Sequence, residues 1–82
     1  MKFQISQKDK EIVELIDVSS MRSKPRIIES GDKVHLVVSD DEREEFMICF
    51  NEAIVSFGLD EQEKVNKLGK RMYSLYDKLL SA

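Results

Sequence analysis

The apolar residues of this chain change their spacing from one segment to the next, and each spacing predicts a different element. Apolar and polar residues alternate over residues 2–6, which predicts a short strand. Ser6 and Asp9 then form a capping-box pattern at the start of a predicted helix over residues 7–18. The apolar face of that helix has helical spacing and comprises Ile12, Val13, Leu15 and Ile16.

A hairpin is predicted after a polar connection. Residues 19–26 are polar and hold the single proline, Pro25, which disfavours helix at the residue before it. A Ser-Gly-Asp turn follows at residues 30–32, where Gly31 can adopt a positive φ without strain. The strand after the turn places alternate residues on one face: Val34, Leu36 and Val38. The strand before it is expected at the sheet edge, because a proline lies near its start.

The second half predicts two helices joined by a very short turn. Residues 40–57 carry a wide apolar face behind a Ser-x-x-Glu capping box at residues 39–42. Gly58 follows as an expected left-handed cap, and residues 60–63 supply another cap pair. The helix over residues 60–80 has apolar positions at spacings of three and four: Val65, Leu68, Met72, Leu75 and Leu79. We expect the two helices to pack antiparallel.

Together these elements predict an α+β fold in the order strand, helix, strand, strand, helix, helix. The short N-terminal strand and the hairpin form a small, mostly antiparallel sheet, which is packed by one N-terminal helix and a C-terminal antiparallel helix pair. A chain of 82 residues has room for one domain, so residues 1–82 are expected to form a single small globular domain. Its core is thin for its surface, so a partner could add to its stability.

Composition and charge narrow the classes of function. The net charge of −3 argues against general affinity for nucleic acid or anionic lipid. No apolar run approaches the roughly 20 residues of a membrane span, and residues 1–6 lack the apolar stretch of a signal peptide. We therefore expect a cytoplasmic protein without a membrane partner. One cysteine and one histidine cannot supply the roughly four ligands of a zinc site.

No residue pattern predicts catalysis. His35 normally titrates near neutral pH, but the hairpin places it on the face opposite the apolar residues, without a nucleophile motif. Cys49 lies in mid-helix among apolar residues and is expected to be a buried small hydrophobe. The carboxylates of residues 40–45 lack an EF-hand pattern and suit the positive end of a helix dipole. We expect no catalytic, metal or cofactor site and therefore no enzyme.

Two features of the predicted helices suggest contact with another surface. Ile48 and Val55 lie seven residues apart, nearly opposite the main apolar face of their helix. Either the sheet and the last helix cover them, or they form an intermolecular surface with an aromatic residue such as Tyr73. Gly69 is costly inside a helix, which indicates a close approach by a backbone of this chain or of a second copy.

Basic residues provide a second possible surface. The polar connection holds one group of basic residues: Arg22, Lys24 and Arg26. The last helix holds another: Lys64, Arg71 and Lys78. Charge pairing with the acidic start of the preceding helix is the simpler explanation of the second group. DNA reading by the closing helices is not expected, because three carboxylates occupy the start of the second one.

The sequence therefore predicts a small non-enzymatic interaction module: a regulator, inhibitor or accessory protein. It is expected to dock on another protein or on a second copy of itself, as a homodimer. The alternative hypothesis is a nucleic-acid-binding accessory protein that uses one of the local basic patches. An enzyme that uses His35 with acidic partners is a third and remote hypothesis.

Overall fold

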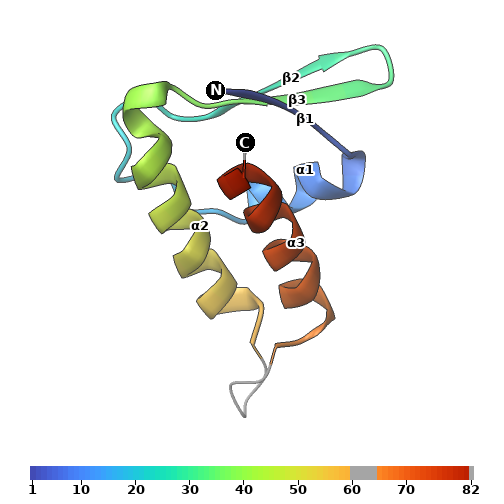
Figure 1. The fold of residues 1–82 in the computed structure, drawn as a ribbon, viewed down its shortest axis with the longest axis vertical. Helices are drawn as coiled ribbons and strands as arrows, with labels where there is room; N and C mark the ends of the chain where they lie inside the picture. The colour runs from blue at the N-terminus through green and yellow to red at the C-terminus, as the bar shows by residue number, and fades with distance from the viewer. Residues whose placement is uncertain (60–64, 82) are drawn as a thin grey trace.

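The structure is a computed structural model of the chain and describes residues 1–59 and 65–81 (Figure 1). Within these residues, three strands, three α-helices and one 3-10 turn follow one another along the chain. They are β1 (Lys2–Ile5), α1 (Gln7–Glu14), β2 (Arg26–Ser30), β3 (Lys33–Val37), η1 (Asp40–Glu42), α2 (Arg43–Phe57) and α3 (Lys67–Ser81). The predicted α+β class and element order are confirmed.

The sheet is antiparallel in the order β1-β3-β2, so the predicted edge position of the first hairpin strand is confirmed. Leu36 on the central strand lies opposite Phe3 on one side and Ile27 on the other. Gly31 has a φ of 62° in the turn between β2 and β3, as the sequence predicted. The alternating residues Val34, Leu36 and Val38 are buried, so this face of the sheet belongs to the core.

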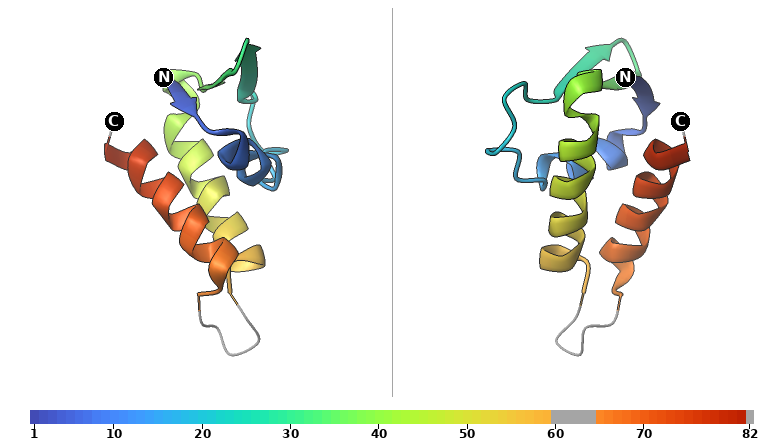
Figure 2. Two further views of the ribbon diagram at one scale, coloured as in Figure 1. Left: turned by 90° about the vertical axis from the view of Figure 1, so that its right-hand side faces the viewer. Right: turned by 60° about the vertical axis from the view of Figure 1, so that its left-hand side comes forward.

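The sheet lies across one end of the molecule, and α2 and α3 extend away from it side by side (Figures 1 and 2). The predicted antiparallel packing of these two helices is confirmed. The core joins all the layers, and its largest fully buried side chains are Phe46, Phe50, Ile12, Leu36, Ile54, Met72, Leu75 and Leu79. Burial of this apolar surface is the main favourable term in folding.

The first helix begins as predicted and ends early. The backbone N–H of Asp9 donates to Ser6 Oγ at 3.0 Å, and the N–H of Ser6 donates to Asp9 Oδ2 at 3.5 Å, so the capping box is confirmed. The predicted end at residue 18 is wrong, because α1 stops at Glu14. Three residues later, the Asp17 carboxylate accepts the backbone N–H of Ser19, which lowers the pKa of Asp17 and favours a turn over helix.

The second helix begins later than predicted. Residues Asp40–Glu42 form a 3-10 turn, and the side chain of Ser39 makes no capping hydrogen bond, so the predicted capping box is wrong. Asp40 instead accepts a hydrogen bond from the amino group of Met1 at 2.9 Å, and this positive charge lowers the pKa of Asp40. The regular helix starts at Arg43 and keeps its predicted end at Phe57.

The last helix starts at Lys67 rather than at residue 60. The predicted cap at residues 60–63 lies outside the described residues, whereas Val65 pairs with Leu59 in an isolated antiparallel bridge. Asn66 caps the helix, because its Oδ1 accepts the backbone N–H of Gly69 at 2.7 Å. Its Nδ2 also donates to the carbonyl oxygen of Phe57 at 3.1 Å, which ties the start of α3 to the end of α2.

The two glycines at this junction contact each other. Gly58 has a φ of −92°, so the predicted left-handed cap is wrong. A Cβ on Gly58 would lie 2.8 Å from Gly69 Cα, and a Cβ on Gly69 would overlap the Gly58 carbonyl. The close approach predicted at Gly69 is therefore made by the same chain.

Candidate docking groove

The three residues that the sequence marked for contact are all exposed. Ile48 has 49% of its surface exposed, Val55 has 59% and Tyr73 has 39%. The sheet and the last helix therefore do not cover Ile48 and Val55, and the explanation that they do is wrong. The reason is that α3 and the sheet pack against the opposite face of α2, where Phe46 and Phe50 are fully buried.

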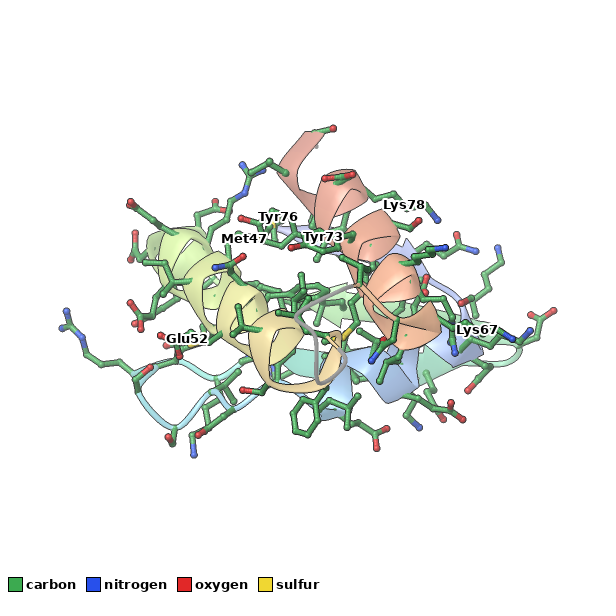
Figure 3. All side chains as sticks on the ribbon, turned by 90° about the horizontal axis from the view of Figure 1, so that it is seen from below. Met47, Glu52, Lys67, Tyr73, Tyr76 and Lys78 are labelled. Atoms are coloured by element: carbon green, nitrogen blue, oxygen red, sulfur yellow. The ribbon has the colours of Figure 1, made fainter. Side chains whose placement is uncertain are left out.

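An open groove runs between α2 and α3 and has a volume of about 650 Å³. Its lining residues come from both helices and the preceding turn: Asp40, Arg43, Glu44, Met47, Ile48, Asn51, Glu52, Tyr76 and Leu80. Figure 3 labels Met47 on α2 and Tyr76 on α3, which both line this groove. Ile48 therefore lines the groove. Val55 on α2 and Tyr73 on α3 are exposed but are not among its lining residues.

The floor of the groove is formed by side chains that pack against the hydrophobic core. The ring of Tyr76 packs edge-on against Phe50, with centroids 5.6 Å apart. Met47 is buried, whereas Leu80 keeps 57% of its surface exposed. The sequence pattern did not mark Met47, Tyr76 or Leu80 for contact with a partner. A signal existed in the spacing of Tyr73, Tyr76 and Leu80, which are three and seven residues apart and so share one side of a helix.

The rim of the groove is acidic. Glu44 and Glu52 are exposed, and neither forms an ion pair with another described residue. Arg43 is the basic residue among those that line the groove. Its guanidinium donates to the carbonyl oxygens of Leu79 at 3.0 Å and Leu80 at 3.5 Å, at the negative end of α3. This cation is therefore held against the C-terminal turn of α3.

The basic residues that the structure describes lie in separate places. The first group is exposed: Arg22 and Lys24 lie in the connection before β2, and Arg26 is the first residue of β2. Lys24 and Arg26 line one hollow, whereas Arg22 borders another beside Asp41 and Glu42. Of the second group, Lys64 lies outside the described residues. Arg71 donates to the carbonyl oxygen of Lys8 at 3.2 Å.

Lys78 lies with Lys67 on the side of α3 away from α2 (Figure 3). Lys78 forms no ion pair with a described residue, so its expected pairing with the acidic start of α2 is not found. Among the carboxylates near the start of α2, Asp40 pairs with the Met1 amino group and Glu45 accepts a hydrogen bond from Ser20, so these partners come from elsewhere than α3. The two helices therefore present opposite charges on different sides of the molecule.

The chemistry-bearing side chains lie apart from this groove. His35 lies on β3 opposite Gln4 and Ile28, on the face away from the core, as predicted. Cys49 is buried as predicted, with its Sγ 3.5 Å from Ser20 Oγ. No cluster of three or more potential metal-ligating side chains occurs in residues 1–59 and 65–81.

Two further findings bear on function. None of the helices described here combines the length and the apolar character needed to cross a membrane. No protein-family model, curated protein or solved structure matches this chain. The groove between α2 and α3 is the surface feature from which we infer a function.

Proposed function

We propose that this protein is a non-enzymatic interaction module that binds another protein through the groove between α2 and α3. The observation that carries the proposal is that exposed apolar side chains from two helices, Ile48 and Leu80, line one groove together with the buried Met47. An apolar groove between packed helices is a common site for a partner helix. A regulator, inhibitor or accessory protein would act through such a surface.

The exposed apolar side chains on α2 and α3 are grouped around the groove rather than scattered. Single exposed apolar side chains are normal on a protein surface, whereas contiguous ones mark interaction sites. Here Ile48 and Leu80 line the same groove. Val55 and Tyr73 are further exposed apolar side chains on the two helices that form it. Because these side chains are already about half buried, covering each one contributes about 1 kcal/mol, roughly half of the value for complete burial.

The proposal is tested by comparative capture from a lysate of the source cells. The tagged protein is compared with the variant Ile48→Asp/Leu80→Asp, which places charges in the groove. Leu15→Asp/Ile28→Asp is the matched control, because both of its positions are exposed apolar residues outside the groove. We expect a protein that is recovered with the parent and the control, and at least about tenfold less with the groove variant, a loss of about 1.4 kcal/mol.

Quantitative mass spectrometry measures the recovery, and circular dichroism confirms that all three proteins are folded. Recovery of every captured protein at equal levels by the parent and the groove variant would overturn the proposal. Recovery of nucleic acid that depends on Arg22, Lys24 and Arg26 would favour the alternative function instead. Lys24 and Arg26 line one hollow, but Arg22 borders another beside Asp41 and Glu42, and this mixed charge leaves nucleic-acid binding as the second hypothesis.

A further inference from the structure

We propose that the segment bound in this groove is a basic amphipathic helix of another protein, and not a second copy of this chain. The inference rests on the proposed function and names the chemistry of its partner. It is carried by the juxtaposition of an apolar floor with two exposed glutamates that form no ion pair with any described residue. The central part of that arrangement is Glu44, Ile48 and Glu52 on α2.

These three residues follow one another at intervals of four and therefore lie along one side of α2. A helix that covers Ile48 passes a carboxylate one turn before it and another one turn after it. Across the groove, Tyr76 and Leu80 offer apolar contacts from α3. The complementary segment has apolar residues at helical spacing, with Lys or Arg on the edge that faces α2.

The carboxylates of Glu44 and Glu52 require a positively charged partner. A carboxylate that loses water at an interface costs free energy unless a cation or hydrogen-bond donor replaces the water. Glu44 and Glu52 have no ion-pair partner among the described residues, and Arg43 is held by the C-terminal carbonyls of α3. The partner must therefore bring the cations, and its positive charge also accelerates its encounter with the acidic rim.

A second copy does not meet this requirement. In a twofold dimer the same patch contacts itself, so the carboxylates of one groove would approach those of the other. Both copies also carry a net charge of −3. Lys67 and Lys78 lie on the side of α3 away from α2, so a groove-to-groove dimer leaves them outside the interface (Figure 3).

A partner helix fits the groove better than an extended basic tail does. The groove runs between two packed helices, and a third helix can contact both with side chains spaced along one face. A tail that carries charge alone would satisfy Glu44 and Glu52 but leave Ile48 and Leu80 exposed. The acidic rim and the apolar side chains of the groove are both contacted only when the partner has an apolar stripe beside a basic stripe.

The test uses three fluorescent peptides and the full chain. The first is a Leu-Lys amphipathic peptide of about 16 residues, roughly four helical turns. The second has Glu in place of every Lys, and the third has the composition of the first with the Leu spacing scrambled. Fluorescence anisotropy at an ionic strength of about 0.15 M measures the dissociation constants. We expect the first peptide to bind at least about tenfold more tightly than either of the others.

Two variants of equal net charge show where the peptide binds. Glu44→Lys/Glu52→Lys reverses the rim, and Glu11→Lys/Glu14→Lys reverses two exposed carboxylates on α1. We expect the rim variant to lose at least about tenfold in affinity for the basic amphipathic peptide, and the α1 variant to stay within about twofold. Equal losses in both variants, or equal binding of the amphipathic and scrambled peptides, would overturn the inference.

The two proposals fail in different ways. If capture depends on Ile48 and Leu80 but the peptides show no preference for positive charge, the groove binds a partner of another chemistry and only the present inference is wrong. If capture does not depend on these residues, the proposed function itself is wrong. A homodimer that dissociates on substitution of Ile48 also overturns the present inference, since a second copy then occupies the groove.

Discussion

Replacement of Phe50 by Ala is expected to lower the free energy of unfolding by about 3–5 kcal/mol. Phe50 is fully buried on α2, and its ring packs edge-on against Phe46 at 6.1 Å and Tyr76 at 5.6 Å between centroids. The substitution removes the transfer free energy of the ring and leaves a cavity. It also removes the support of Tyr76 on the groove floor. Because a small domain has only about 5–15 kcal/mol in total, much of the stability would be lost.

The measurement is urea unfolding followed by circular dichroism. Phe57→Ala is the matched control, because it makes the same change on the same helix at a residue with 46% of its surface exposed. We expect the control to lose less than about 1 kcal/mol. Equal losses for the two variants would show that Phe50 does not occupy the core position described here.

Replacement of Gly69 by Ala is expected to destabilise the protein by about 1–3 kcal/mol, although Ala favours helix over Gly by about 1 kcal/mol. The added Cβ would overlap the carbonyl of Gly58, and it would lie 2.9 Å from the carbonyl carbon. A backbone group cannot move aside as a flexible side chain can, so α2 and α3 must separate at this end. That separation would strain the hydrogen bond from Asn66 N–H to the Gly58 carbonyl oxygen, now 2.9 Å long.

The same unfolding experiment decides the sign of this effect. Ser74→Ala provides the control, because Ser74 is exposed on the same helix and its replacement tests helix propensity alone. We expect Ser74→Ala to be neutral or slightly stabilising. If Gly69→Ala were also stabilising, the two backbones would not approach each other as the structure shows.

The order of the elements could be predicted because each segment has its own hydrophobic period. The alternation of Val34, Leu36 and Val38 was sufficient to predict β3. The Ser6–Asp9 pair was sufficient to predict where α1 begins. Helix boundaries were less predictable, because contacts between distant residues compete with local patterns. Next to Ser39, whose predicted cap does not form, Asp40 accepts a hydrogen bond from the amino group of Met1, a contact that no local pattern contains.

The candidate site could be predicted only in part. The spacing of Ile48 and Val55 showed that α2 has apolar residues on two sides, but spacing cannot say which side the rest of the chain covers. Met47 and Leu80 became groove residues only through the position of α3 against α2. Gly69 was identified from its cost in a helix, whereas its neighbour Gly58 required the tertiary fold.

The central claim is that the free protein presents an open groove to a different, basic partner. The mass in solution tests this claim most directly, measured by light scattering from micromolar concentrations to the solubility limit. We predict a monomer of 9.5 kDa throughout, for the parent and for Ile48→Asp alike. A particle of twice that mass, reduced to the monomer by Ile48→Asp but not by Glu11→Lys, would contradict the claim.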